Sequence, residues 1–306
     1  MDKQDYRKVG IMKKPLKLGF TDTNTQIATF FANVLSSQYE ITIDHENPDY
    51  LIFGDTNFGT NNLKYDFNKV TKIFYTGENQ RPWDYQCHYA ISFDHIENEN
   101  FYRMPLYVIY DWHNRMKNET SWFTYRRYIS DLDADKKQKF CSFVVRNPNC
   151  QRRNDFFHKL SSEYKNVDSG GPLFNNIGYV LEYGDAAMKA KNKWLQDYKF
   201  NICFENSSYP GYATEKLYEA YIGGTIPIYW GSPTIEVDFN PKAFLNWYDY
   251  GSDDALIEAI IELDNNPQKY KEMYMQPLFN GSSNNLNRFM NLSKFLDWFD
   301  TNVYKG

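Results

Sequence analysis

The densest group of side chains that could do chemistry lies between residues 199 and 231. Glu205-Asn206-Ser207 follows an apolar run there, and Thr214-Glu215-Lys216 comes a few residues later. This order predicts a buried strand, a loop and a helix that opens at Thr214, an arrangement whose free N–H groups and dipole attract a phosphate. Lys216 would add a point charge for that phosphate, while Glu215 would accept hydrogen bonds from a vicinal diol such as a ribose. A capped helix with a solvated Glu215–Lys216 pair explains the spacing equally well.

A second group lies at the start of another predicted helix, where Arg152-Arg153-Asn154 follows the apolar run 140–145. Positive charge at a helix N-terminus opposes the helix dipole, so arginines are unusual there unless an anion is present. A guanidinium on a diphosphate is the functional interpretation, with only one of the pair facing a cleft. Two solvated arginines remain the alternative.

A third candidate is Glu78, which follows Gly77 at the end of the predicted strand 70–75. A carboxylate at the carboxyl edge of a strand is well placed for general-base catalysis. Taken alone the signal is weak, because a glutamate in a loop is far more often solvated than catalytic.

Composition narrows the class of protein that could carry these groups. The chain has 306 residues, which suits two domains. A formal charge of −5 argues against a nucleic-acid binder, and the mean hydropathy of −0.70 argues against a membrane protein. The amino terminus has no secretory signal pattern, and the four cysteines (Cys87, Cys141, Cys150 and Cys203) have neither C-x-x-C nor zinc spacing. We therefore expect reduced, structural cysteines and a cytoplasmic location.

Short apolar runs alternate with amphipathic stretches in two series, which predicts βαβ units and largely parallel sheets. The first series has strands at 16–20, 39–43, 50–53, 70–75 and 89–93 and a helix at 25–35. The second has strands at 140–145, 199–204 and 226–230 and helices at 154–164, 186–196, 214–222, 253–263, 267–275 and 287–299. Between them, residues 112–139 are polar and show no period, so a domain boundary is expected near their end. Two α/β domains with ligand between them, at the carboxyl ends of the strands, is the favoured architecture.

Six segments together resemble a known family: Tyr75-Thr76-Gly77-Glu78-Asn79, Arg103-Met104-Pro105-Leu106-Tyr107, Phe140-Cys141-Ser142-Phe143-Val144-Val145, Cys203-Phe204-Glu205-Asn206-Ser207, Tyr212-Ala213-Thr214-Glu215-Lys216 and Ile226-Pro227-Ile228-Tyr229-Trp230-Gly231-Ser232-Pro233. In this order they resemble the α-1,3-fucosyltransferases of glycosyltransferase family ten, most closely the bacterial enzymes. The resemblance covers roughly residues 74–241.

The resemblance implies a GT-B fold with two facing Rossmann-like domains and the active site in the cleft between them. Residues 1–138 would bind the acceptor and residues 139–306 would bind GDP-fucose, with the last helix a candidate to pack back on the first domain. The implied roles are as follows: Glu78 is the general base, Arg153 and Lys216 hold the diphosphate near Thr214, Glu215 accepts ribose or fucose hydroxyls, and Asn206 and Tyr212 line the donor pocket. Arg153 is preferred over Arg152 because the family places its arginine directly before an asparagine.

The implied reaction is inverting transfer of L-fucose from GDP-fucose to the 3-hydroxyl of GlcNAc in an N-acetyllactosamine-type β-galactoside, giving a Lewis x-type product. An α-1,4 or mixed linkage and a catalytically silent binding module for glycans or GDP-sugars remain alternatives. No metal is required, although a divalent cation could stimulate. The repeated D-x-D at 131–135 is interpreted as a linker or cap, peripheral membrane contact is left open, and so is the oligomeric state. Trp83, Trp112 and Trp122 could stack on an acceptor sugar, but ordinary packing explains each of them better.

Overall fold

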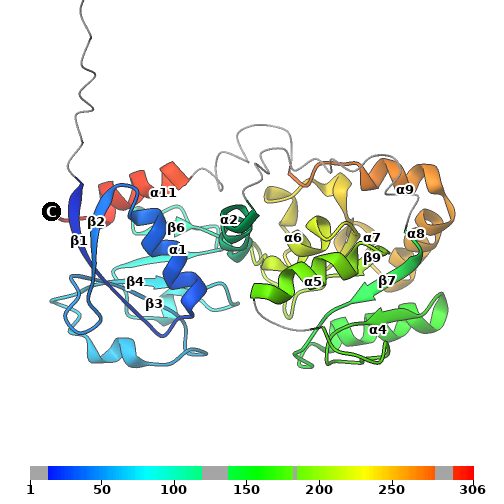
Figure 1. The fold of residues 1–306 in the computed structure, drawn as a ribbon, viewed down its shortest axis with the longest axis horizontal. Helices are drawn as coiled ribbons and strands as arrows, with labels where there is room; N and C mark the ends of the chain where they lie inside the picture. Colours follow the sequence, from blue (N-terminus) through cyan, green and yellow to red (C-terminus); the bar gives the residue numbers. More distant parts are fainter. Residues whose placement is uncertain (1–12, 119–136, 182–184, 280–291) are drawn as a thin grey trace, which may run out of the picture.

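The computed structural model describes residues 13–118, 137–181, 185–279 and 292–306, which form two lobes side by side (Figure 1). Each lobe is built on one parallel sheet. The strands of the first sheet lie in the order β2-β1-β3-β4-β5-β6. Their bounds are β1 Lys14–Thr21, β2 Tyr39–Ile43, β3 Tyr50–Phe53, β4 Thr71–Tyr75, β5 Tyr89–Ser92 and β6 Phe101–Arg103.

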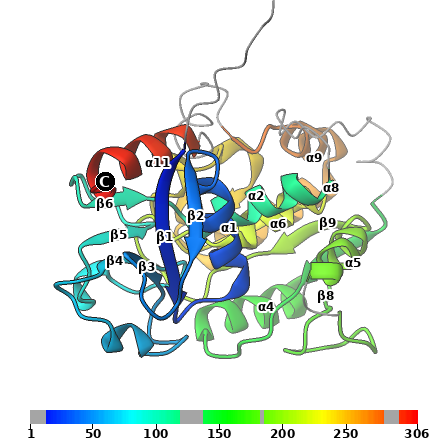
Figure 2. The ribbon, with the colours of Figure 1, turned by 60° about the vertical axis from the view of Figure 1, so that its left-hand side comes forward.

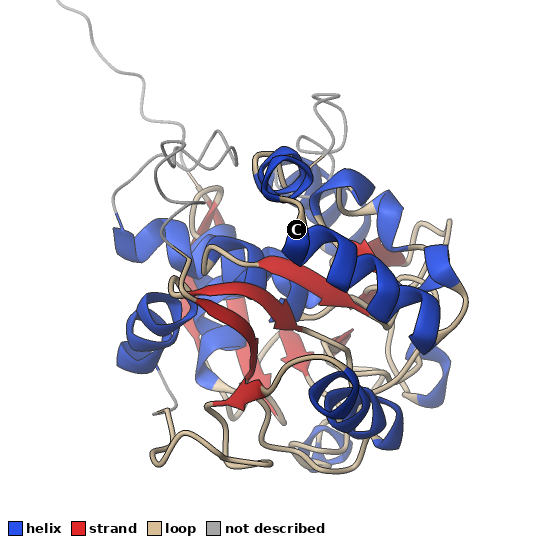
Figure 3. Cartoon of the chain, turned by 90° about the vertical axis from the view of Figure 1, so that its right-hand side faces the viewer, coloured by secondary structure: helices blue, strands red, loops and turns tan. Residues whose placement is uncertain are grey.

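The second sheet has the order β11-β10-β9-β7-β8, again parallel throughout. Its strands are β7 Lys139–Phe143, β8 Val167–Ser169, β9 Tyr198–Ile202, β10 Ile226–Tyr229 and β11 Leu245–Asn246. The helices of this lobe flank the sheet (Figure 3). They are α4 Gln151–Glu163, α5 Asp185–Leu195, α6 Glu215–Ile222, α7 Trp247–Tyr250, α8 Asp253–Asn265 and α9 Pro267–Tyr274.

Both sheets have strands buried on both faces, as parallel strands covered by helices require. β3, β5 and β10 are buried at every position. In the first lobe, α1 (Thr25–Leu35) begins where the Asn24 side chain accepts a hydrogen bond of 2.9 Å from the backbone N–H of Ile27. The two predicted series of strands and helices are therefore confirmed as two α/β halves.

The sequence pattern did not predict a helix at the start of the polar stretch that begins at residue 112. Residues 106–118 form α2 (Leu106–Asn118), which lies between the lobes (Figure 1). Its inner face carries polar groups that have partners across the interface: Asp111 is fully buried and accepts from the hydroxyl of Tyr218 on α6 at 3.1 Å. The D-x-D segment and Trp122 lie outside the described residues.

The carboxyl-terminal elements lie on the first lobe (Figures 1 and 2). Helix α11 (Leu292–Trp298) places the Phe295 ring against Phe31 of α1, with 5.8 Å between ring centroids. The π-helical turn Phe299–Val303 follows, and its Asp300 accepts from Lys14 at 2.6 Å and from the Tyr39 hydroxyl at 2.7 Å. The end of the chain thus covers the sheet formed by its beginning.

The two lobes are joined by a buried interface rather than by a hinge alone. One apolar core runs from the first sheet into α6, where Leu217 and Ala220 are buried. Arg103, at the end of β6, donates two hydrogen bonds of 2.8 Å to Asp238 of the second lobe. These contacts join two α/β lobes, the two-domain arrangement that the resemblance to GT-B enzymes implies. None of the helices within the described ranges is both long enough and apolar enough to span a membrane.

Candidate active site

A cavity of about 190 Å³ lies where the two lobes meet. Its walls come from the loops after β1, β3 and β4 on one side and from the start of α6 on the other. Residues from both lobes line it: Thr23, Asn24, Gln26, Ile27, Gly54, Asp55, Phe58, Tyr75, Thr76, Gly77, Glu78, Leu106, Tyr110, Thr214, Glu215 and Lys216. Because ligands of open α/β sheets bind at the carboxyl ends of their strands, this cavity is the candidate active site.

Glu78 enters the cavity from the loop after β4. Its backbone N–H donates to the Thr76 hydroxyl oxygen at 3.0 Å, and that hydroxyl donates to the buried carboxylate of Asp55 at 2.8 Å. The loop is therefore held in place by its own Thr76 and by Asp55 of the loop after β3. Burial raises the pKa of the Glu78 carboxyl above its ordinary value of 4.5, while the nearby Lys216 ammonium opposes that rise. A carboxylate whose pKa is raised is a stronger base, which suits proton removal.

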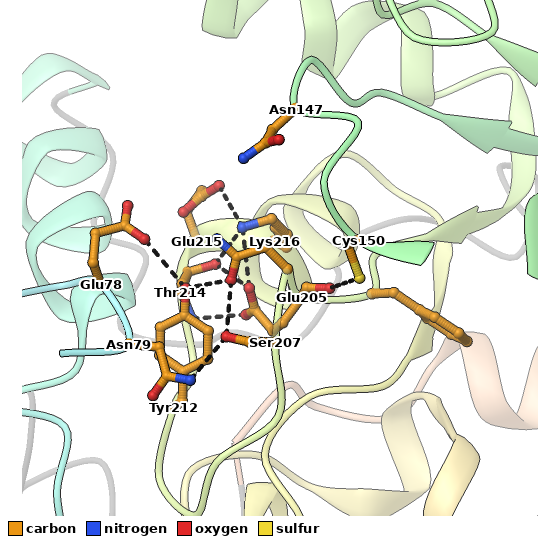
Figure 4. Close-up of polar contacts among 12 residues, drawn as sticks. Glu78, Asn79, Asn147, Cys150, Glu205, Ser207, Tyr212, Thr214, Glu215 and Lys216 are labelled. Carbon is orange, nitrogen blue, oxygen red and sulfur yellow. Dashed lines mark hydrogen bonds and ion pairs between the residues drawn. The ribbon is translucent and has the colours of Figure 1, made fainter. Parts of the chain in front are cut away.

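Tyr212 connects Glu78 with the second lobe (Figure 4). Its hydroxyl lies 2.9 Å from Asn206 Oδ1 and 3.4 Å from Glu78 Oε2. The Tyr212 residue is fully buried, and its ring packs against Phe93 with 5.0 Å between ring centroids. Asn79, next to Glu78, donates to the Ser207 hydroxyl at 2.9 Å and ties the same two loops together.

Lys216 is held by a carboxylate to which sequence reasoning assigned no role. Glu205 is fully buried, and its two oxygens accept from the Thr214 N–H at 2.8 Å, the Thr214 hydroxyl at 2.7 Å and the Lys216 ammonium at 3.0 Å (Figure 4). Burial alone would lower the pKa of Lys216, but the carboxylates of Glu205 and Glu215 raise it, so the ammonium stays charged. Glu205 therefore already accepts the N–H of Thr214, one of the free N–H groups at the start of α6 that the sequence analysis assigned to a phosphate.

The neighbouring arginines have different surroundings. Arg152 pairs with Asp253 and lies over the Trp247 ring, 4.8 Å from its centroid. Arg153 is buried, donating to the Asn147 carbonyl at 2.7 Å and to the Phe204 carbonyl at 3.4 Å. Its Nε has no partner among the described residues, and burial lowers its pKa. A buried guanidinium with an unsatisfied donor, beside the Glu205 segment, suits an anion better than the paired Arg152 does.

Three predicted site residues (Thr214, Glu215 and Lys216) line one cavity with Glu78, and Asn206 and Tyr212 join Glu78 through hydrogen bonds. Arg153 lies behind Glu205 and outside the cavity lining. The sequence interpretation missed Glu205, Asp55 and Phe58. Glu205 carried one usable signal, since a carboxylate directly after a buried strand must lie at the carboxyl edge of the sheet.

Three further features bear on the chemistry. Within the described ranges, no three His, Cys, Asp or Glu side chains gather as a metal ion would require. The four cysteines are free thiols, three of them buried. Trp112, one of the tryptophans considered for sugar stacking, packs edge-on against Phe30 at 5.4 Å and is buried.

Comparison with known proteins agrees with this geometry along most of the chain. Residues 18–110 match the family profile "Alpha-(1,3)-fucosyltransferase FucT N-terminal domain", and residues 134–276 match "Glycosyltransferase family 10 (fucosyltransferase) C-term". The Alpha-(1,3)-fucosyltransferase FucT of Helicobacter pylori is 35% identical over 298 residues, covering 88% of this chain. The chain spans 60% of the length of that relative.

Solved structures extend the likeness to the fold. A crystal structure of an α1,3-fucosyltransferase matches with a TM-score of 0.79 and 30% identity, covering 94% of this chain and 90% of that one. A second, of an α1,3-fucosyltransferase with GDP-fucose, matches with a TM-score of 0.77 and 29% identity, covering 100% of this chain and 94% of that one. The chain matches two profiles of one family in the expected order, and it matches a solved α1,3-fucosyltransferase over 90% of that structure's length. It therefore belongs to glycosyltransferase family 10, the fucosyltransferases.

Proposed function

We propose that this protein transfers L-fucose from GDP-fucose to the 3-hydroxyl of GlcNAc in an N-acetyllactosamine-type acceptor, with inversion at the anomeric carbon. The observation that carries the proposal is the placement of Glu78 from one lobe and Lys216 from the other in one cavity. A single displacement needs a base beside the incoming hydroxyl and positive charge beside the leaving diphosphate, and these two groups would supply both.

In this mechanism Glu78 takes the proton of the acceptor hydroxyl while that oxygen attacks the anomeric carbon of fucose. The bond from carbon to the diphosphate oxygen breaks, and its electron pair leaves with GDP. Tyr212, which donates to Glu78 at 3.4 Å, would hold the carboxylate in place during the transfer. Attack from the face opposite GDP gives the inverted product.

Lys216 and Arg153 are the groups proposed for the developing charge on the diphosphate. The ammonium of Lys216 contacts Glu215 at 3.4 Å, its longest contact, so a phosphate oxygen could replace this partner at the least cost. Glu215 would then be free to accept hydrogen bonds from donor hydroxyls. The unsatisfied Nε of Arg153 is the second candidate donor.

The test is turnover of the purified protein with GDP-fucose and N-acetyllactosamine, followed by linkage analysis of the product by NMR. We expect an α-1,3 linkage, whereas an α-1,4 or mixed product would correct the linkage without changing the reaction class. Binding of GDP-fucose without any transfer would instead support the silent binding module and overturn the proposal.

Glu78→Gln provides the mechanistic half of this test. It should lower kcat by about 10²- to 10⁴-fold, the usual share of a general base. GDP affinity measured by calorimetry should stay unchanged, because the substitution leaves Lys216 and Arg153 in place. Glu258→Gln on α8 is the matched control, since Glu258 is exposed, and it should not affect either quantity. Full turnover by the Glu78 variant would remove Glu78 from this role.

The location of the protein remains a prediction. We propose that it acts in the cytoplasm, and fractionation of cells that express the chain would test this, including the alternative of peripheral contact with a membrane.

A further inference from the structure

An aromatic side chain that no motif singled out stands in the wall of the candidate active site. Phe58 lines the same cavity as Glu78 and Lys216, yet its residue surface is 48% exposed. Single exposed apolar residues are common on protein surfaces and need no explanation by themselves. Among the described residues that are large, apolar and exposed, however, Phe58 is the only one that belongs to this cavity; Leu63, Trp83 and Tyr179 do not line it.

The turn that carries Phe58 is fixed to the first lobe by a network of polar contacts. Its backbone N–H donates to the carbonyl of Asp55 at 3.0 Å. The buried Asp55 carboxylate accepts from the N–H of Asn57 at 3.0 Å and from the hydroxyl of Thr76 at 2.8 Å. Asp55 therefore joins the Phe58 turn to the loop that positions Glu78.

The far side of the turn is held just as closely. Gly59 has φ +138°, and a side chain there would lie 2.6 Å from a carboxylate oxygen of Asp22. The same Asp22 carboxylate accepts hydrogen bonds from the backbone and side-chain N–H groups of both Asn61 and Asn62. The Phe58 ring is thus presented to the cavity by backbone that is clamped at both ends, which is the condition for a preorganised contact.

The position of the ring separates the two substrates. The groups proposed for the diphosphate, Lys216 and Arg153, belong to the second lobe, whereas Phe58 and Glu78 belong to the first. The acceptor hydroxyl must lie within hydrogen-bond reach of Glu78, so the acceptor sugar must lie against the first lobe. A pyranose presents an apolar C–H face, which an exposed aromatic ring can cover.

We propose that Phe58 forms the acceptor subsite, where its ring stacks on the C–H face of a pyranose unit of the acceptor. In this proposal Asp55 is the positioning residue, because it fixes the turn of Phe58 relative to the loop of Glu78. The proposal rests on the proposed function, because it deepens the acceptor half of that reaction. It assigns acceptor recognition to a residue whose sequence surroundings carry no recognisable motif.

The experiment compares Phe58→Ala, Phe58→Trp and Leu63→Ala. Leu63→Ala is the matched control because Leu63 is 67% exposed and lies close in the chain but outside the cavity. Acceptor KM and kcat are measured with N-acetyllactosamine at saturating GDP-fucose, and GDP affinity is measured by calorimetry. Binding of N-acetyllactosamine in the presence of GDP is followed by NMR, which tests the subsite without turnover.

We expect Phe58→Ala to weaken acceptor binding and raise acceptor KM by about 2- to 10-fold, the worth of one aromatic contact, with kcat within about twofold of the wild type. Phe58→Trp should restore the affinity, and Leu63→Ala should behave as the wild type. An unchanged acceptor affinity in Phe58→Ala would overturn the proposal, as would a loss of GDP affinity equal to the loss of acceptor affinity. If the wild type binds N-acetyllactosamine through Phe58 but transfers no fucose, the proposed function fails and the subsite stands.

Discussion

The contact between Glu205, Thr214 and Lys216 makes a quantitative prediction about stability. In Glu205→Gln the side chain keeps its shape but loses its charge and one of its two acceptor oxygens. Three donors face this side chain: the backbone N–H and hydroxyl of Thr214, at 2.8 Å and 2.7 Å, and the ammonium of Lys216, at 3.0 Å. The amide oxygen can satisfy the hydroxyl and the ammonium, but its NH₂ group then faces the N–H of Thr214.

The size of the effect follows from burial. Leaving one buried donor without an acceptor costs about 1–3 kcal/mol. Replacing a charge-assisted hydrogen bond by a neutral one, roughly half as strong, adds about 1 kcal/mol. We therefore expect Glu205→Gln to lower the free energy of unfolding by about 2–4 kcal/mol.

A matched control is present in the same lobe. Glu262 and Lys269 form an ion pair between helices α8 and α9, with side chains that are 62% and 54% exposed. An exposed pair of this kind contributes only about 0.2–1 kcal/mol. Glu262→Gln removes the same charge from the same type of pair, so the difference between the two variants isolates the effect of burial.

Urea unfolding followed by fluorescence measures both variants. With a urea dependence of about 3 kcal/mol per molar, the Glu205 variant should unfold at a midpoint lower by about 1 M. The midpoint of the Glu262 variant should move by no more than a third of that. Equal midpoints for the two variants would refute the view that Glu205 stabilises the start of α6 and the position of Lys216.

Three further predictions concern the other charged groups. Arg153→Ala should weaken GDP binding by about tenfold or more, since a charged hydrogen bond is worth about 1.5–3 kcal/mol. Arg152→Ala should mainly lower stability, because the partner of Arg152 is Asp253. Calorimetry with GDP compares the two variants, and equal GDP affinities would contradict the assignment. Because burial raises the pKa of Glu78 above 4.5, kcat/KM should fall as the pH drops through that raised pKa, and a pH profile whose acid limb lies at or below 4.5 would contradict a buried base. Burial alone would raise the pKa of Asp22, but the N–H groups of Asn61 and Asn62 hold it below 3.8, so its stabilising effect is full above pH 3.8 and is lost as the pH falls through the lowered folded-state pKa. Asp22→Asn should therefore cost about 1–3 kcal/mol at pH 7 and progressively less as the pH is lowered below 3.8, as measured by urea unfolding at each pH. A cost independent of pH would show that the charge plays no part.

Much of the fold was predictable because local pattern and tertiary environment agree in this chain. The strands at 39–43 and 50–53 and the helix at 25–35 were predicted with the bounds that the structure shows. The short strands β6, β8 and β11 were not, since two or three residues cannot display a period. Helix α2 was not predicted, and its buried Asp111 and Asn114 are satisfied by Tyr218, a partner more than a hundred residues away that only the structure reveals.

The candidate site was likewise predicted from the sequence only in part. Residue types and order alone pointed to Glu78, to the pair Arg152-Arg153 and to the segment 214–216, because each follows a predicted strand or opens a predicted helix. The choice of Arg153 from that pair came from the family resemblance. Their catalytic and binding roles stay predictions until the variants are measured. The structure adds that Glu78 from the first lobe and residues 214–216 from the second line one cavity, and that the Tyr212 hydroxyl lies within hydrogen-bond distance of Glu78.

The sequence by itself therefore determined the class of fold, the family and the segments that carry chemistry, because these depend on local periodicity and on contiguous motifs. Only the tertiary structure decided which charges are already paired. It shows Arg152 held by Asp253 and Lys216 held by the buried Glu205. The physical reason is that Asp253 and Glu205 lie on other elements of the second lobe than Arg152 and Lys216, and only the packing of that lobe brings them within hydrogen-bond distance.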